Sequence, residues 1–193
     1  TVNYLEKGTD TVLHNPKTVN DQTFGTVIKS INEIISINGY NYDSSDKESL
    51  TIGTSENIIN IYYTKVEGLS YTVNYLEKDT NEVLHPAKTQ GNQVFESVIE
   101  SSNEVIDIDG YNFANADKET LIIGTGENVI NLYYTKRTDL SYTVNYLEKG
   151  TDEVLQTPKT VTDQTFGTVI ESINEVISIN GYNYDSSDKE SLT

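Results

Sequence analysis

The sequence contains no cysteine, and basic residues are far fewer than acidic ones. Without cysteine the chain forms no disulfide, has no thiolate nucleophile and ligates no metal through sulfur. The absence of disulfides fits an exported protein and an intracellular one equally well. A folded unit of this chain is therefore expected to depend on hydrophobic packing in place of disulfides.

The charge balance excludes further classes of function. Lysine and arginine total 13 against 30 acidic residues, which gives a formal net charge of −17 and a pI near 4.3. Because binding to nucleic acid and to anionic lipid depends on basic side chains, we expect neither partner. The simplest interpretation of the acids is a solvated, mutually repelling surface.

The sequence also lacks long apolar runs. No stretch approaches the 18–20 or so apolar residues that cross a bilayer, so we expect no membrane insertion of this segment. No secretion signal or sorting tail is visible. We therefore expect the chain to be a piece of a longer protein whose export or anchoring signals lie elsewhere.

What the sequence does contain is an internal repeat. The string TVNYLEK begins at Thr1, Thr72 and Thr143, a period of 71 residues each time. The first 51 residues recur from Thr143 to Thr193 with six differences, at Thr11/Glu153, His14/Gln156, Asn15/Thr157, Asn20/Thr162, Lys29/Glu171 and Ile34/Val176. The middle copy has diverged further. Self-similarity at a fixed period indicates tandem modules.

Two polar, dissimilar segments, 66–70 and 137–141, separate strand-like runs and are interpreted as linkers. They predict repeat units at residues 1–65, 71–136 and 142–193. The third unit has no counterpart of Ile52–Lys65, its closing strand. The alternative phase, with an incomplete first unit, remains open.

Within the first unit, alternating apolar residues and turn signals predict five strands. They are Thr1–Lys7, Thr11–His14, Tyr40–Asp43, Ser49–Ile52 and Asn57–Thr64. Gly8-Thr9-Asp10 supplies the turn of an opening hairpin. The last strand has the strongest signal, with Ile59, Ile61 and Tyr63 on one side.

Between the second and third of these strands the apolar period changes to that of a helix. The residues in question are Phe24, Val27, Ile28, Ile31, Ile34 and Ile35. Their spacing predicts one continuous apolar stripe of an amphipathic helix, capped by Asp21 or Thr23. The predicted fold class is therefore α+β: tandem small β-grasp-like modules, each a mixed sheet packed on one helix.

The strings YTVNYLEKGTDEVL, GYNYD and IINIYYTK resemble the MucBP (mucin-binding protein) repeat family. The positions that carry this resemblance in the middle copy are Val73, Tyr75, Gly110, Tyr111, Tyr133, Tyr134 and Lys136. The predicted helix departs from the family pattern. The resemblance implies tandem β-grasp-like modules on the cell-wall-associated surface of a Gram-positive bacterium, and a host glycoprotein or glycan as partner.

The sequence predicts no catalytic site, no metal site and no cofactor. The residues that would bind a partner are unknown. The only histidines are His14 and His85, and the third repeat has Gln156 at the matching position. A histidine-based catalytic or metal site common to all three repeats is therefore excluded. No phosphate loop, nucleophile elbow or zinc-protease motif occurs. We therefore expect no enzyme.

Two other possibilities remain open. The acids Asp43, Asp46 and Glu48, with Asp185, Asp188 and Glu190 in the third copy, could bind calcium, although a solvated turn explains them better. Lys7 and Lys78 with Asn60 and Asn131 have the residue types of a Lys–Asn cross-link.

The function expected from these observations is a non-enzymatic repeat region of a bacterial surface protein. It would act as an elongated stalk, as an adhesion module, or as both. The alternative is an adhesin that binds glycan or mucin through many weak sites.

Overall fold

The computed structural model describes all residues, 1–193. Its contacts divide the chain into two compact units. One comprises 1–73, 87–103 and 118–130, and the other comprises 74–86, 104–117 and 131–193. The division passes through the middle repeat, so the first repeat lies wholly in one unit and the third repeat wholly in the other.

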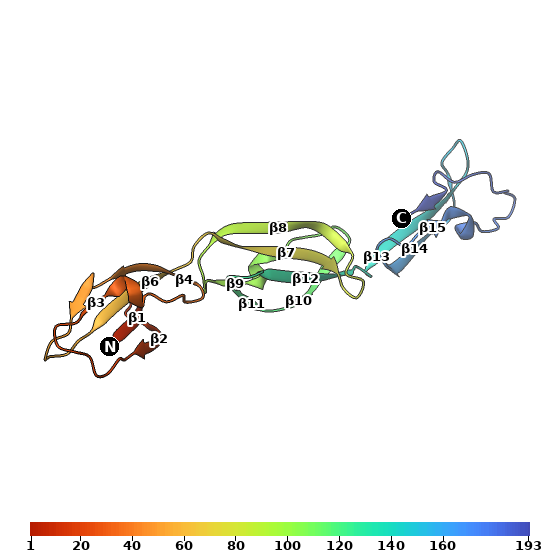
Figure 1. Ribbon diagram of the computed structural model, residues 1–193. Coiled ribbons are helices and arrows are strands. Elements are labelled where there is room, and N and C mark those ends of the chain that lie inside the picture. The colour runs from red at the N-terminus through yellow and green to blue at the C-terminus, as the bar shows by residue number, and fades with distance from the viewer. The chain divides into compact units, whose positions relative to one another are not determined.

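The first repeat is built on a four-stranded mixed sheet (Figure 1). Its strands are β1 (Val2–Glu6), β2 (Val12–Lys17), β4 (Tyr40–Ser45) and β6 (Ile59–Lys65), in the order β2-β1-β6-β4. β1 runs antiparallel to β2 and parallel to β6, while β4 is antiparallel to β6. The first and last strands of the repeat are therefore neighbours at the centre of the sheet.

A second layer covers one face of this sheet. It contains β3 (Val27–Lys29), a single 3-10 turn η1 (Ser30–Glu33) and β5 (Ser49–Thr51). β3 and β5 pair antiparallel, with Ile28 opposite Leu50. The buried Ser30 hydroxyl donates to the carbonyls of Lys47 and Glu48 at 2.7 and 2.8 Å, which ties η1 to the chain before β5.

The hydrophobic core lies between the two layers. Its fully buried residues are Val2, Tyr4, Ile59, Ile61 and Tyr63, all on β1 and β6. Partly buried side chains from the second layer and the sheet margins pack against them: Leu13, Ile28, Ile34, Ile35, Ile37, Tyr40 and Leu50. The closing strand thus contributes three of the five central side chains, so the core depends on it.

The middle repeat contains the same series of elements. They are β7 (Leu69–Glu77), β8 (Val83–Gln93), β9 (Val98–Glu100), η2 (Ser101–Glu104), β10 (Tyr111–Ala116), β11 (Thr120–Ile122) and β12 (Val129–Lys136). Strands β10-β12-β7-β8 form the main sheet and β11-β9 the small one.

The third repeat forms fewer strands. β13 (Leu140–Leu147) pairs with β14 (Val154–Gln164), and β15 (Ile170–Glu171) pairs with β16 (Ser191–Leu192) across η3 (Ser172–Glu175). Residues 182–187, the counterpart of β4, form no strand. No residue of this repeat is fully buried.

The predicted helix is wrong, and with it the α+β fold class. Almost all regular structure is strand, and the helical part amounts to the single turns η1, η2 and η3. The residues of the predicted stripe divide between two environments: Ile28, Ile34 and Ile35 pack on the core, whereas Phe24, Val27 and Ile31 are 74%, 57% and 63% exposed. The helical spacing therefore does not correspond to one buried face.

The physical reason combines local and distant effects. β-Branched residues, which dominate this segment, lose side-chain freedom in a helix and favour extended backbone. Lys29 and Ile34, which flank η1, are both extended. Ile35 donates its N–H to the Tyr63 hydroxyl at 3.1 Å, and that hydroxyl donates to the Ile35 carbonyl at 3.0 Å. A side chain from β6 thereby satisfies the backbone groups that a helix would have paired.

The five segments predicted as strands are strands. β6 ends at Lys65 and β7 begins at Leu69, and similarly β12 ends at Lys136 and β13 begins at Leu140. The connections between repeats are thus only three residues long, shorter than the predicted linkers. The unit boundaries 1–65, 71–136 and 142–193 stay predictions. No helical segment has the length and apolar character needed to span a bilayer.

Candidate functional site

Three of the six acidic residues considered for calcium, Asp43, Asp46 and Asp185, have partners within their own repeat. Asp43 Oδ2 accepts from Lys7 Nζ at 2.5 Å and from the Ser44 hydroxyl, and the lysine lowers the pKa of this carboxyl group. Asp46 lies 3.1 Å from Lys47 Nζ. In the third repeat, Asp185 pairs with Lys149. No group of three or more acidic or histidine side chains converges to hold a metal ion.

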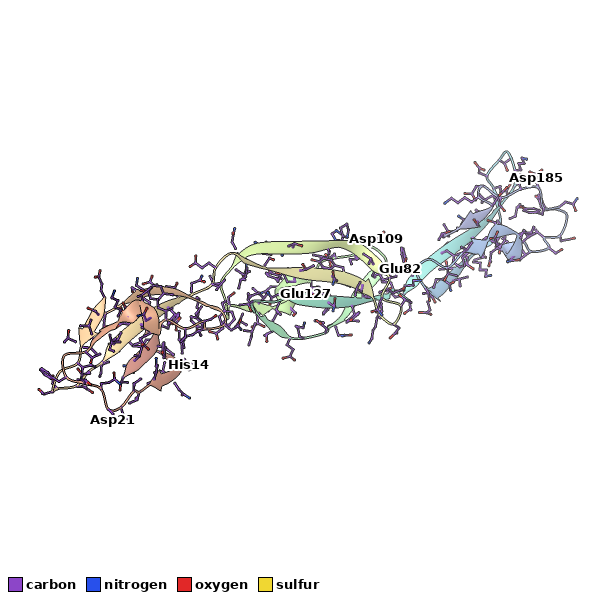
Figure 2. The ribbon with its side chains drawn as sticks, in the orientation of Figure 1. His14, Asp21, Glu82, Asp109, Glu127 and Asp185 are labelled. Atoms are coloured by element: carbon purple, nitrogen blue, oxygen red, sulfur yellow. The ribbon has the colours of Figure 1, made fainter.

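Many of the acids are exposed to solvent. Asp21, Glu82, Asp109, Glu127 and Asp185, labelled in Figure 2, are all exposed. Exposed acids in excess over basic residues are typical of a solvated surface whose charges repel one another.

The residues considered for a Lys–Asn cross-link have different partners. Lys7 contacts Asp43, whereas the Asn60 side-chain amide donates to Asp46 at 3.3 Å and accepts from Asn3 at 2.8 Å. In the middle repeat Asn131 similarly donates to Asp117 at 3.2 Å. These amides therefore connect strands through hydrogen bonds.

The histidines pack against core tyrosines. His14, labelled in Figure 2, meets Tyr4 edge-on at 5.5 Å between ring centroids, and His85 meets Tyr75 at 5.3 Å. Of the positions that carry the family resemblance, Val73, Tyr75 and Tyr134 are buried core residues. Burial leaves these three side chains unable to contact a glycan.

Two of the remaining resemblance positions, Gly110 and Tyr111, belong to a different feature, a contact between consecutive repeats that we call the joint. In the first joint, the Phe95 ring of the middle repeat packs on Gly39 and Tyr40 of the first repeat. A Cβ atom at Gly39 would lie only 2.3 Å from this ring, so glycine is required there. Tyr40 and Phe95 meet edge-on, with centroids 5.6 Å apart. Aromatic pairs of this kind contribute about 0.5–1.5 kcal/mol beyond their buried area.

Backbone hydrogen bonds hold the joint in register. Val66, in the connection, donates its N–H to the Gly39 carbonyl and accepts from the Phe95 N–H, each at 2.9 Å. The Thr125 hydroxyl of the middle repeat also donates to the Asn38 side chain at 3.0 Å. The connection is therefore bonded to both repeats that it joins.

The first joint carries an ion pair as well. Lys65 Nζ lies 3.0 Å from Glu96 Oε2, which also accepts from the Tyr40 hydroxyl at 3.3 Å. Hydrogen bonding to Glu96 raises the pKa of Lys65. Glu96 has a left-handed backbone, with φ of +65°, where the other repeats have Gly25 and Gly167. A non-glycine residue in this region is strained, and the strain accompanies the bonds that its carboxylate makes.

The second joint repeats the aromatic and backbone contacts. The Phe166 ring lies against Gly110, where a Cβ atom would be 2.4 Å away, and meets Tyr111 at 5.6 Å. Arg137 donates its N–H to the Gly110 carbonyl at 2.9 Å and accepts from the Phe166 N–H at 2.8 Å. Because Gly167 replaces Glu96, no carboxylate is available for the ion pair of the first joint.

The matching outer positions make no such contact. Phe24, the counterpart of Phe95 and Phe166, is 74% exposed. A Cβ atom at Gly181, the counterpart of Gly39 and Gly110, would meet nothing within 4 Å. These two positions are natural controls for the joint.

A cleft of about 720 Å³ lies in the third repeat. Tyr142, Val144 and Tyr146 of β13 line it, together with Val176 and Tyr182. The corresponding space in the first repeat holds Ile59, Ile61 and Tyr63 of β6.

The joint was not predicted from the sequence. The apolar spacing instead placed Phe24, the counterpart of Phe95, on a helix. A signal was present, because phenylalanine recurs at positions 24, 95 and 166 and glycine at 39, 110 and 181, all outside the alternating strand patterns. Nothing in the spacing says, however, that a phenylalanine packs on the glycine of the preceding repeat.

Comparison with known proteins adds no identity: neither a family model nor a curated protein matches the chain.

Proposed function

We propose that this chain is a non-enzymatic repeat region of a bacterial cell-surface protein that acts as a stalk, in which consecutive repeats contact each other directly at the joints. The observation that carries the proposal is the recurrence of one joint at the 71-residue period. Gly39 with Phe95 and Gly110 with Phe166 make the same contacts. A freely jointed string of domains has no need for a glycine fitted to the next domain's ring.

The acidic surface and the sequence support the same function. A net charge of −17 keeps neighbouring stalks apart and soluble. The surface location rests on the resemblance to MucBP repeats. A host glycan or glycoprotein as partner rests on that resemblance alone.

Small-angle scattering of the full chain tests the stalk. We expect an elongated particle, and a compact globule would contradict the proposal. Replacing Phe95 and Phe166 together by alanine should release both joints and broaden the distribution of interatomic distances. Phe24→Ala, at the exposed matching position, is the control and should leave the distribution unchanged.

Binding to glycan or mucin is tested separately, by comparing one repeat with the full chain on a glycan array. Affinity that rises with the number of repeats would favour the adhesin alternative, because linked weak sites gain avidity. If neither the single repeat nor the full chain binds, the adhesin alternative is contradicted and the stalk function remains.

A further inference from the structure

The first and last strands of a complete repeat lie side by side and point the same way. In the first repeat β1 and β6 pair in parallel over five residues, from Val2 opposite Ile59 to Glu6 opposite Tyr63. The repeats are joined in series, so tension along the chain enters at the start of β1 and leaves at the end of β6. In a parallel pair these two points lie at opposite ends, so the tension shears one strand past the other.

Shear loads the hydrogen bonds of such a pair together. The bonds at both ends are present: Ile59 donates its N–H to the Thr1 carbonyl at 3.0 Å, and Lys7 donates to the Tyr63 carbonyl at 2.8 Å. Peeling an antiparallel pair from one end instead breaks its bonds one at a time. The same number of hydrogen bonds therefore resists shear more strongly than peeling.

Side chains connect the same two strands. The Asn3 amide donates to Asn60 Oδ1 at 2.8 Å, across the parallel pair. Asn60 in turn donates its backbone N–H and its side-chain amide to Asp46 at 3.0 and 3.3 Å. The middle repeat has the equivalent bond from Asn74 to Asn131 at 2.9 Å.

The core side chains Val2, Tyr4, Ile59, Ile61 and Tyr63 lie on these two strands, and each is at most 6% exposed. Sliding β1 past β6 therefore also exposes the centre of the hydrophobic core to water, which is unfavourable. The pair is protected against shear by backbone bonds, an amide bond and apolar packing at once.

We propose that the β1–β6 pair is a force-bearing clamp, and that each complete repeat resists tension along the chain. The proposal deepens the stalk function, on which it rests, by assigning the load to named strands. In the third repeat β13 pairs with β14 alone, so the clamp is assigned only to the complete repeats.

Single-molecule force spectroscopy on the full chain tests this directly. Because the chain has no cysteine, introduced cysteines are unique attachment points. Handles at Thr1→Cys and Glu67→Cys shear β1 against β6. Handles at Asn41→Cys and Thr64→Cys, which are exposed partners on β4 and β6, peel an antiparallel pair of the same repeat. We expect a several-fold higher rupture force in the first geometry, and equal forces would overturn the proposal.

The amide bond has its own test. Asn3→Ala should lower the force in the shear geometry and leave the peeling force unchanged. Asn15→Ala on β2, an exposed asparagine outside the pair, is the matched control. An unchanged shear force in Asn3→Ala would overturn the role of this bond in the clamp.

Failure of the clamp and failure of the stalk are distinguishable. A low shear force with an elongated scattering profile would contradict only the clamp. A compact particle whose first repeat resists shear would contradict only the stalk.

Discussion

The first and third repeats are almost the same sequence over 51 residues, yet their structures differ. The segment YNYDSS occurs in both, as Tyr40–Ser45 and as Tyr182–Ser187. In the first repeat it is strand β4, and in the third it forms no strand. The first repeat has five fully buried core residues, and the third has none.

The difference comes from one missing partner. β4 pairs only with β6, and the third repeat has no counterpart of β6. Without it, the tyrosines and valine of β13 line an open cleft. The local sequence of β4 is therefore insufficient for strand formation, and pairing with a distant segment decides it. By contrast, β15 and β16 still pair, as β3 and β5 do, because neither of those strands depends on the closing strand.

Supplying the missing strand should remove the difference between the two repeats. Appending a copy of Ile52–Lys65 after Thr193 should convert Tyr182–Ser187 into a strand. The stabilisation should reach several kcal/mol, since burying one aliphatic or aromatic side chain contributes about 1.5–3 kcal/mol. Amide hydrogen exchange of residues 182–187 measures it. The same extension with serine at the counterparts of Ile59, Ile61 and Tyr63 is the control, and protection by both extensions would contradict the explanation.

The converse change should make the first repeat resemble the third. Ile61 is fully buried on β6, so Ile61→Ala should cost about 2–5 kcal/mol of unfolding free energy. Chemical denaturation followed by tyrosine fluorescence gives the value. Ile31→Ala, at a position 63% exposed, should change stability by less than about 0.5 kcal/mol. Equal losses of stability at the two positions would contradict the assignment of Ile61 to the core and of Ile31 to the surface.

Alanine substitutions at two glycines distinguish the cost of the joint contact from the cost of the left-handed backbone. Gly39 and Gly181 both have positive φ, +80° and +85°. Replacing either by alanine should cost roughly 1–2 kcal/mol for the left-handed conformation. Only Gly39→Ala also collides with the Phe95 ring, so it should be the more destabilising of the two in thermal unfolding.

The additional destabilisation by Gly39→Ala, compared with Gly181→Ala, should disappear in a Phe95→Ala background, where the ring is absent. An excess that survives the removal of the ring would show that the joint contact is not its cause.

The smallest expected effect is an acid sensitivity concentrated in the third repeat. Hydrogen bonds from Lys159 and Tyr142 lower the pKa of Glu175 below its ordinary value of 4.5. Lys149 similarly lowers the pKa of Asp185 below 3.8. Since the folded pKa values are the lower ones, these groups stabilise the fold above their ordinary pKa values, and the stabilisation is lost as the pH falls through the folded values.

The first repeat has a similar pair, Lys7 with Asp43, and also a buried core. Between pH 6 and about pH 2 we therefore expect the NMR signals of the third repeat to change before those of the first. If the NMR signals of both repeats change at the same pH, the predicted order is contradicted.

The 71-residue repeat and five of the six strands of the first repeat are recognisable from the sequence alone, whereas β3, at Val27–Lys29, was predicted as part of a helix. Alternation of apolar residues is a local property, so β1 and β6 could be recognised from residues such as Ile59, Ile61 and Tyr63. The acidic surface also follows from composition alone. The sequence was misleading at Phe24–Ile35, where apolar spacing imitates a helix although the β-branched residues disfavour one.

The environments of those apolar residues depend on contacts with distant parts of the chain. Ile34 and Ile35 face the core because the Tyr63 hydroxyl holds the Ile35 backbone, and Phe95 packs on a glycine of the preceding repeat. Both contacts join residues far apart in the sequence, and neither leaves a periodic trace in it. The same reason explains why YNYDSS is a strand in one repeat and not in another: pairing energy comes from the partner, and the partner lies outside the segment.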